Sequence, residues 1–276
     1  MLSFRFAKAQ TDVVQSVLHA HVKALSFPWD SFLEESILKN QMIAIYHENL
    51  LIGYANIEGD LLFSFHVLLS HYSHAPAALE NLIQAYQLRS VLALTSDPLL
   101  MSLLFEWDYA VKERLGCFFA DQGRLAKPQI KAANPLFRQA VESDIPAILQ
   151  STEDFFDNIA DRVRQQTIFL LEDGAELLGC GIMEKSKFFS NCVSIGMVTP
   201  KKHRQKGVAQ TILWHLKEYA YGLQLQPIAG CWYYNVLSRK SLEAAGLIAA
   251  TKGLVLTLQG KKTLPLRTGN PPGELV

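Results

Sequence analysis

The sequence lacks a long apolar run, a pattern of paired cysteines and an excess of charge of either sign. No apolar stretch among its 276 residues approaches the roughly 20 residues that cross a membrane. The apolar start at residues 1–6 is too short for a signal peptide and lacks its basic leader. The four cysteines have neither disulfide nor metal-ligand spacing, so we expect no disulfide and no metal site. These absences favour a cytoplasmic protein without a membrane partner.

Charge is balanced overall but unevenly distributed. The chain has 26 Lys and Arg against 26 Asp and Glu, so a nucleic-acid partner is not expected. Residues 1–134 contain 10 basic against 13 acidic side chains, whereas residues 135–276 contain 16 against 13. The slight positive excess of the second half points to an anionic ligand there. Apolar residues make up 49% of the chain, enough for the core of one large domain or of two ordinary ones.

A basic loop in the second half has the pattern of a phosphate-binding site. Residues 198–209 read VTPKKHRQKGVA and lead into a predicted helix over residues 210–221. The amides from Gln205 to Ala209 are expected to point into the loop, where the start of the helix adds positive potential. Gly207 lets the backbone approach a phosphate that a side chain would block. The alternative is a basic turn that only begins a surface helix.

This loop and a later segment resemble the GNAT acetyltransferase superfamily. The family's acyl-CoA loop, Q/R-x-x-G-x-G/A, matches residues 204–209, and its N-x-x-S/A helix start matches Asn235 and Ser238, after a predicted strand at 227–233. The predicted helix ends at Gly246, as in the family. Asn235 would contact the pantetheine arm of acetyl-CoA, although a helix N-cap is its alternative role. The resemblance implies that the cofactor is bound by Met197, Val198, His203, Arg204, Gln205, Lys206, Gly207, Val208, Ala209, Asn235 and Ser238.

The same resemblance predicts an α+β fold built from two GNAT-like units in tandem, each a mixed, mostly antiparallel sheet flanked by helices. Residues 136–260 would form a complete GNAT domain, followed by a tail at 261–276. Residues 136–145 resemble the family's first strand and the start of its first helix. The further predicted strands cover residues 166–172, 176–183, 192–199 and 254–258, besides the one at 227–233. A turn at Asp173-Gly174 would join the second to the third.

The first half repeats this order of elements without the cofactor motifs. Helices are predicted near residues 12–25, 29–39, 76–88 and 98–106, and strands near 42–46, 51–57, 61–69, 91–94 and up to 119. Residues 1–130 would therefore be a degenerate GNAT-like domain, joined to the second by a linker near 127–135. Where the second half has its glycine loop, the first has residues 70–76 without glycine, and where Asn235 stands it has Asp97. His66, His71 and His74 are interpreted as part of a solvated loop.

The predicted activity is transfer of an acetyl group from acetyl-CoA to a primary amine of a small molecule or peptide, by a monomer or homodimer. Two side chains that many members of the family use are missing. Leu242 stands where many members have a tyrosine that acts as the acid, and residues 188–200 contain no carboxylate, although many members have a glutamate on this strand as the base. Tyr233, Tyr234 and Glu184 are the predicted substitutes, each with an ordinary structural role as its alternative. A non-catalytic acyl-CoA-binding or regulatory protein is the alternative function.

Overall fold

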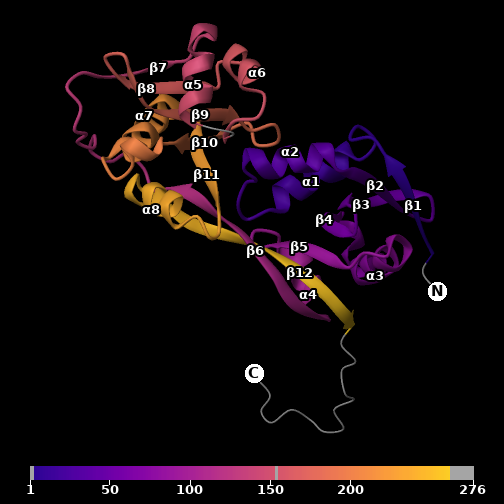
Figure 1. The fold of residues 1–276 in the computed structure, drawn as a ribbon. Coiled ribbons are helices and arrows are strands. Elements are labelled where there is room, and N and C mark those ends of the chain that lie inside the picture. Colours follow the sequence, from indigo (N-terminus) through magenta and orange to yellow (C-terminus); the bar gives the residue numbers. More distant parts are fainter. Residues whose placement is uncertain (1–2, 153–154, 262–276) are drawn as a thin grey trace, which may run out of the picture.

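One sheet of twelve strands runs through both halves of the chain (Figure 1). The structure, a computed structural model, describes residues 3–152 and 155–261, so the predicted tail from 262 onward lies outside the described residues. The strand order is β1-β2-β3-β4-β5-β12-β6-β11-β10-β9-β8-β7. Within the described residues, β4–β5 and β10–β11 are the only parallel pairs. The fold is therefore the predicted α+β arrangement, a mixed and mostly antiparallel sheet flanked by helices.

The first half contains every predicted element and one further strand. Its elements are β1 (Phe4–Ala9), α1 (Gln15–Ala24), α2 (Ser31–Lys39), β2 (Gln41–His47), β3 (Leu50–Glu58), β4 (Leu61–Val67), the 3-10 helix η1 (Leu69–His74), α3 (Ala75–Tyr86), β5 (Ser90–Leu94), α4 (Pro98–Leu104) and β6 (Trp107–Asp121). The prediction omitted β1, which lies at the edge of the sheet. Edge strands bury little surface, so their alternation of apolar and polar residues is weak.

The second half also follows the prediction closely. Its elements are β7 (Pro135–Gln139), the 3-10 helix η2 (Glu142–Asp144), α5 (Ile145–Thr152), α6 (Ile159–Arg164), β8 (Ile168–Asp173), β9 (Glu176–Lys185), β10 (Cys192–Val198), the 3-10 helix η4 (Lys201–His203), α7 (Val208–Gly222), β11 (Gln226–Trp232), α8 (Val236–Ala244) and β12 (Leu247–Lys261). Gly174 turns the β8–β9 hairpin with a φ of 62°. The prediction of the last strand was too short, because β12 spans 15 residues.

The two halves exchange their last strands. β6 ends the first half in sequence, yet it pairs with β11 of the second half, with Cys117 opposite Cys231. In the same way β12 ends the second half but pairs with β5 of the first, with Val255 opposite Leu92. β6 and β12 also pair with each other along their length, from Leu247–Asp121 to Lys261–Trp107. Neither half therefore has a complete sheet of its own.

Helices cover both faces of this sheet. In the first half, α1 and α2 bury Trp29 and Leu33 on one face, and α3 and α4 bury Leu79 and Leu100 on the other. In the second half, α5 and α6 pack against one face and α7 and α8 against the other. Phe118 and its neighbour Phe119 on β6 point to opposite faces, Phe118 toward the α1–α2 core and Phe119 toward the α7–α8 core.

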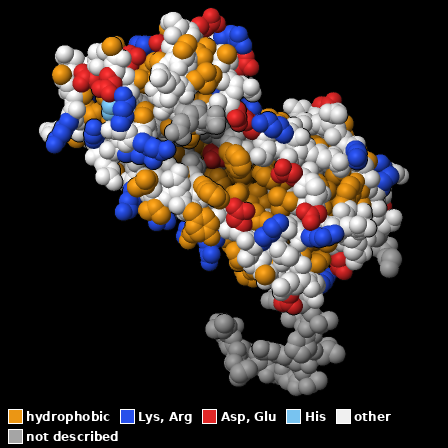
Figure 2. Space-filling model, in the orientation of Figure 1, with side chains coloured by type: hydrophobic (Ala, Val, Ile, Leu, Met, Phe, Trp, Pro, Cys, Tyr) orange, Lys and Arg blue, Asp and Glu red, His pale blue; other side chains and the backbone are white. Residues whose placement is uncertain are grey.

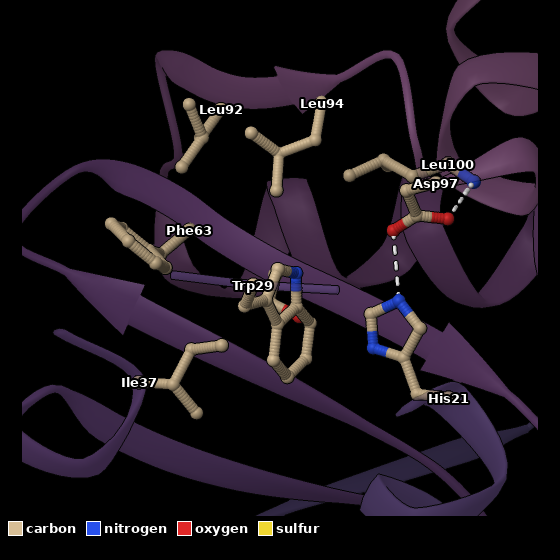
Figure 3. Close-up of a pocket in the computed structure, with 9 residues that line it drawn as sticks. His21, Trp29, Ile37, Phe63, Leu92, Leu94, Asp97 and Leu100 are labelled. Atoms are coloured by element: carbon tan, nitrogen blue, oxygen red, sulfur yellow. Dashed lines mark hydrogen bonds and ion pairs between the residues drawn. The ribbon is translucent and has the colours of Figure 1, made fainter. Parts of the chain in front are cut away.

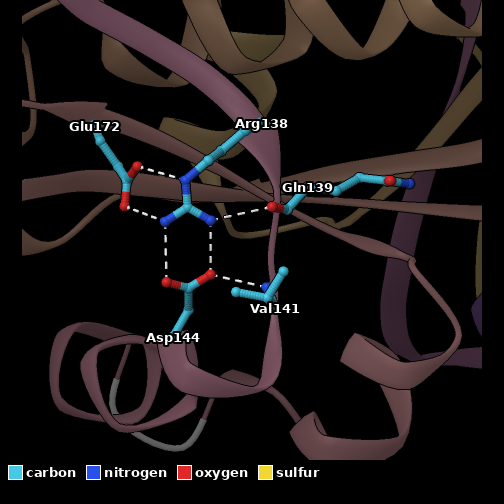
Figure 4. A network of polar contacts seen from close by, with 5 residues as sticks. All are labelled: Arg138, Gln139, Val141, Asp144 and Glu172. Carbon is cyan, nitrogen blue, oxygen red and sulfur yellow. Dashed lines mark hydrogen bonds and ion pairs between the residues drawn. The ribbon is translucent and has the colours of Figure 1, made fainter.

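A network around Arg138 fixes β7, β8 and the start of α5 to one another (Figure 4). Arg138 on β7 donates two hydrogen bonds of 2.8 Å to Glu172 on β8. It also donates bonds of 2.7 and 2.9 Å to Asp144, which accepts a third bond from the Val141 amide. The Arg138 guanidinium lowers the pKa of the Asp144 carboxyl. Paired two-point contacts of this kind hold both carboxylates in fixed orientations.

The predicted linker and the residues just before it, 122–134, are irregular in structure, and the first part of this segment lies along α7. Trp214 on α7 donates a hydrogen bond of 2.9 Å to the carbonyl of Leu125, and Lys217 donates one of 2.8 Å to the carbonyl of Gly123. At the other end, Asp173 accepts bonds from the amides of Ala133 and Asn134 at 3.0 and 2.9 Å. These contacts secure the connection between the halves beside the helix that follows the basic loop.

Candidate functional site

Strands β10 and β11 separate after a short paired segment. Their parallel ladder consists of three pairs and ends at Ser194 opposite Ile228. β10 continues to Val198, and its other edge stays paired with β9 up to the pair Val198–Cys180. The predicted edge residues Met197 and Val198 therefore lie beyond the last β10–β11 pair, where the ladder no longer uses their backbone groups on that side. We refer to this divergence as the β10–β11 splay.

The basic loop connects the open end of the splay to α7. After the short helix η4, Gln205 and Gly207 both have left-handed backbone conformations, with φ of 60° and 81°. Alternating left-handed residues turn successive amides toward one side, which is the geometry of an anion-binding loop. Gly207 is the N-cap of α7, and no side chain of the described residues caps this helix. The amides of its first turn are thus available to a ligand.

The side chains of the loop are only partly free. Lys202 donates a hydrogen bond of 2.8 Å to Glu176, and Arg204 donates one of 3.1 Å to the carbonyl of Thr199. His203 is buried, with Nε2 3.2 Å from Glu176 Oε1, and burial lowers the pKa of its imidazole. Lys206 has no ion-pair partner in the described part of the chain. The lysines at 131, 202 and 206 line a pocket of about 250 Å³ beside the loop.

Asn235 caps α8 at the end of β11. Its side-chain oxygen accepts a hydrogen bond of 3.1 Å from the amide of Ser238. The helix N-cap, which is the alternative role that the sequence suggests for Asn235, is therefore present in the structure. It leaves the side-chain NH₂ group of Asn235 without a bond to any described residue, so capping and ligand binding are compatible.

The three predicted catalytic side chains lie in different surroundings. Glu184 on β9 forms an ion pair with Arg162 on α6, and both side chains are 21% exposed. Tyr233 follows β11 and packs at the edge of the α7–α8 core. Tyr234 is 57% exposed, and its ring centroid lies 5.2 Å from that of Tyr233. Leu242 is buried in the same core.

Comparison with protein families matches both halves separately. Residues 10–122 match a profile described as acetyltransferase (GNAT) domain, and residues 135–246 match one described as acetyltransferase (GNAT) family. The chain belongs to the GNAT acetyltransferase superfamily. It contains two GNAT units in tandem, and no curated protein matches its sequence.

Solved structures share the fold of this tandem GNAT protein at low sequence identity. A GNAT-family acetyltransferase from Colwellia psychrerythraea is 14% identical with a TM-score of 0.81, and the match covers 93% of this chain and 99% of that one. A tandem GNAT protein from the clavulanic acid biosynthesis pathway is 11% identical with a TM-score of 0.62, covering 94% and 100%. A GCN5-related N-acetyltransferase from Sphaerobacter thermophilus is 11% identical with a TM-score of 0.62, covering 93% and 96%.

The N-terminal GNAT unit has an equivalent splay, but side chains fill it (Figure 3). Strands β4 and β5 share only the pairs Leu61–Ser90 and Leu62–Val91. His21 Nε2 lies 3.0 Å from Asp97 Oδ2, and His21 Nδ1 lies 2.7 Å from the hydroxyl of Tyr54. The cavity that remains beside Trp29 and Leu94 has about 10 Å³, room for at most one water molecule.

The interpretation of His66 as a residue of a solvated loop was wrong. His66 lies on β4, is 2% exposed and stacks on His21 with ring centroids 4.5 Å apart. Burial lowers the pKa of its imidazole to about 3. The loop interpretation failed because β4 pairs with β3 as far as Val67, so the strand carries His66 into the core. His71 and His74 are in η1, and no group of metal ligands occurs among the described residues.

Asp30 belongs to the N-terminal half of the chain, yet the structure places it at the site of the C-terminal unit, which was not predicted from the sequence. The amide of the next residue, Ser31, donates a hydrogen bond of 2.8 Å to the hydroxyl of Ser194, the last residue of β10 that pairs with β11. Asp30 Oδ2 lies 1.9 Å from the position that a Cβ atom on Gly230 of β11 would occupy. One turn further on, Glu34 accepts a bond of 2.8 Å from the amide of Lys187 in the β9–β10 loop.

Proposed function

We propose that the C-terminal GNAT unit transfers an acetyl group from acetyl-CoA to a primary amine of a small molecule or peptide. One observation above all supports this: the uncapped glycine loop and the β10–β11 splay lie at the two ends of one continuous segment, residues 195–207. Such a segment offers an anion site and a free strand edge to one elongated molecule. Acetyl-CoA has a pyrophosphate from which an arm with amide groups extends to the thioester.

The roles that we assign follow from these positions. Amides from Gln205 to Ala209 would receive the pyrophosphate at the start of α7, because helix N-termini favour anions. The backbone of Met197 and Val198 would pair with the amides of the arm. The free NH₂ group of Asn235 would donate a hydrogen bond to the same arm, while its oxygen keeps α8 capped. Ser238, whose amide forms that cap, fixes the position of Asn235.

Catalysis in this assignment depends mainly on orientation. A backbone amide beside the thioester would stabilise the negative charge that develops on the carbonyl oxygen. Leu242 is 2% exposed and supplies no proton to the leaving thiolate. Tyr233 and Tyr234 are the hydroxyl groups closest in sequence to Asn235, so they are our candidates for this role. Glu184 is a weaker candidate for the base, because Arg162 already neutralises it.

The alternative is an acyl-CoA-binding protein without transferase activity. The buried Leu242 favours it, because many members of the family have a tyrosine at that position, and the ion pair of Glu184 favours it, because Arg162 neutralises the predicted substitute for the family's base. The two functions predict the same binding but different chemistry.

Thiol release separates them. We expect the full chain to bind acetyl-CoA and to release free CoA when it is mixed with amines of several classes: an amino sugar, a polyamine, an aminoglycoside and a peptide with a free N-terminus. A variant with Asn235 changed to alanine should bind acetyl-CoA more weakly. Tight binding without thiol release from any of these amines would favour the non-catalytic function.

A further inference from the structure

The N-terminal unit contributes a carboxylate to the splay of the C-terminal unit. Asp30 precedes α2, and its Oδ1 accepts a hydrogen bond of 3.0 Å from the amide of Leu33, which makes it the N-cap. Oδ2 occupies the space above Gly230 where any other residue would carry a Cβ atom. Gly230 lies two residues beyond Ile228, where the β10–β11 ladder ends, so Oδ2 lies over the closed end of the splay.

The two oxygens of Asp30 have different partners. The side chain is nearly buried, with the residue 8% exposed. Oδ1 has its capping bond, but Oδ2 accepts no hydrogen bond from any described residue. Oδ2 is not fully buried, so some solvent still reaches it. A nearly buried carboxylate with one open oxygen is costly unless a ligand or water uses that oxygen.

The neighbouring charged groups already have partners. Glu34 accepts hydrogen bonds from the hydroxyl of Ser186 and the amide of Lys187. Glu184 on β9 is paired with Arg162 on α6. The strand residues beneath Asp30, Gly230 and Phe118, carry no charge. Burial, together with the negative charges of Glu34 and Glu184, raises the pKa of Asp30 to about 6.

The surface around this position suits an organic amine. Alternate residues of a strand share a face, so Trp232 lies on the same face of β11 as Gly230 and is 58% exposed. Phe32 on α2, two residues after Asp30, is 57% exposed. Figure 2 shows a hollow between the two halves, bordered by apolar side chains and with acidic groups in and around it. Aromatic faces and a carboxylate attract the cationic form of an amine, and the carboxylate also accepts a hydrogen bond from the N–H of the neutral form.

We propose that Asp30 is the general base of the acetyl transfer, supplied by the N-terminal unit to the site of the C-terminal unit. The proposal rests on the transferase function proposed above. The neutral amine attacks the thioester carbonyl carbon, and a C–N bond forms. The attached nitrogen becomes acidic and gives one proton to Asp30 Oδ2. The C–S bond then breaks, the amide is left behind, and the protonated Asp30 returns the proton to the thiolate, directly or through water.

This role gives the first unit a function in catalysis although its own splay is filled. The exchanged strand β6 pairs with β11, and α2 begins above that pair, so the two units are joined where Asp30 meets Gly230. A base with a raised pKa matches the proton-transfer step at neutral pH better than an ordinary carboxylate does.

The test is Asp30→Asn in the full chain. Asparagine caps helices as well as aspartate, so α2 should keep its start and the variant its melting temperature. We expect turnover to fall about 100-fold, within the range for loss of a general base. Calorimetry should show unchanged acetyl-CoA affinity. Glu35→Gln is the matched control, because it removes a partly exposed carboxylate of the same helix and should keep full turnover.

The pH profile of kcat at saturating amine distinguishes a base from a structural role. Asp30 is active when ionised, so wild-type kcat should fall as pH drops below about 6, and Asp30→Asn should lose this dependence. Gly230→Ala is a second variant, because its new methyl group displaces Oδ2 and should also slow turnover.

The outcomes separate the two proposals. If the wild type acetylates one of the amines named above while Asp30→Asn keeps both its rate and its pH profile, the base assignment is overturned and the transferase function stands. If the wild type binds acetyl-CoA but releases no thiol with any of these amines, both proposals are overturned.

Discussion

Replacing Gly207 by aspartate tests the anion site most specifically. The residue has a φ of 81°, and a Cβ atom there would lie 3.1 Å from the carbonyl oxygen of Gln129 in the linker. A side chain in this backbone region costs about 1–2 kcal/mol of folding stability. The carboxylate adds repulsion toward a bound phosphate. Two unit charges about 4 Å apart repel by roughly 4 kcal/mol near a protein surface, and solvent screening of this exposed loop reduces that to about 2 kcal/mol.

We therefore expect Gly207→Asp to weaken acetyl-CoA binding about 30-fold, measured by calorimetry. Gly174→Asp is the control, because Gly174 also has a positive φ, of 62°, and nothing lies within 4 Å of its Cβ position. The Gly174→Asp variant has similar backbone strain in the β8–β9 turn, away from the loop that contains Gly207. Equal affinities of the two variants would refute the assignment of the loop to the pyrophosphate.

Three further predictions concern the fold. The side chain of Lys217 is 3% exposed, lies 2.7 Å from Asp121 and donates hydrogen bonds to the carbonyls of Gly123 and Ala245. Lys217→Met should therefore lower the free energy of unfolding, measured by denaturant titration, by about 3–5 kcal/mol. The control Lys39→Met, on the surface, should change it by less than about 1 kcal/mol. The pKa of His66 is about 3 in the folded protein, below the unfolded value near 6.5, so its contribution to stability is complete above pH 6.5 and decreases as the pH falls toward 3. The melting temperature of His66→Gln should therefore fall less between pH 7 and pH 4 than that of the wild type. An equal fall in both proteins would contradict this. Because β6 and β12 are exchanged, residues 1–134 and 135–276 expressed separately should lack cooperative unfolding, whereas co-expression should yield a folded complex; two independently folded halves would be inconsistent with the exchange.

Local signals explain why the glycine loop and the helix cap of the candidate site could be predicted from the sequence. The glycine loop and the Asn235 cap depend on residues within a few positions of each other, so their types and spacing were enough to locate them. The element order of the first half could be predicted for the same reason. β1 was missed because it is at an edge, and β12 was predicted too short because residues 247–252 pair with β6 and not with β5, a long-range partner that the local sequence does not indicate.

Long-range pairing explains what the sequence could not supply. Asp30 is 200 positions from Gly230, and nothing near either residue indicates that they meet. The contact depends on β6 entering the second unit, which is a property of the whole sheet. His21 and Asp97 similarly fill the first splay from elements 76 positions apart. From the sequence alone, Asp97 was identified only as the residue at the position that corresponds to Asn235 of the second half.

The number of acetyl-CoA molecules bound per chain tests the central claim most directly. The C-terminal unit has an uncapped glycine loop and an open splay, whereas the His21–Asp97 pair and Trp29 fill the splay of the N-terminal unit. Calorimetric titration of the full chain with acetyl-CoA should therefore saturate at one equivalent, and Gly207→Asp should weaken that single event. Saturation at two equivalents, or no binding at all, would contradict the account.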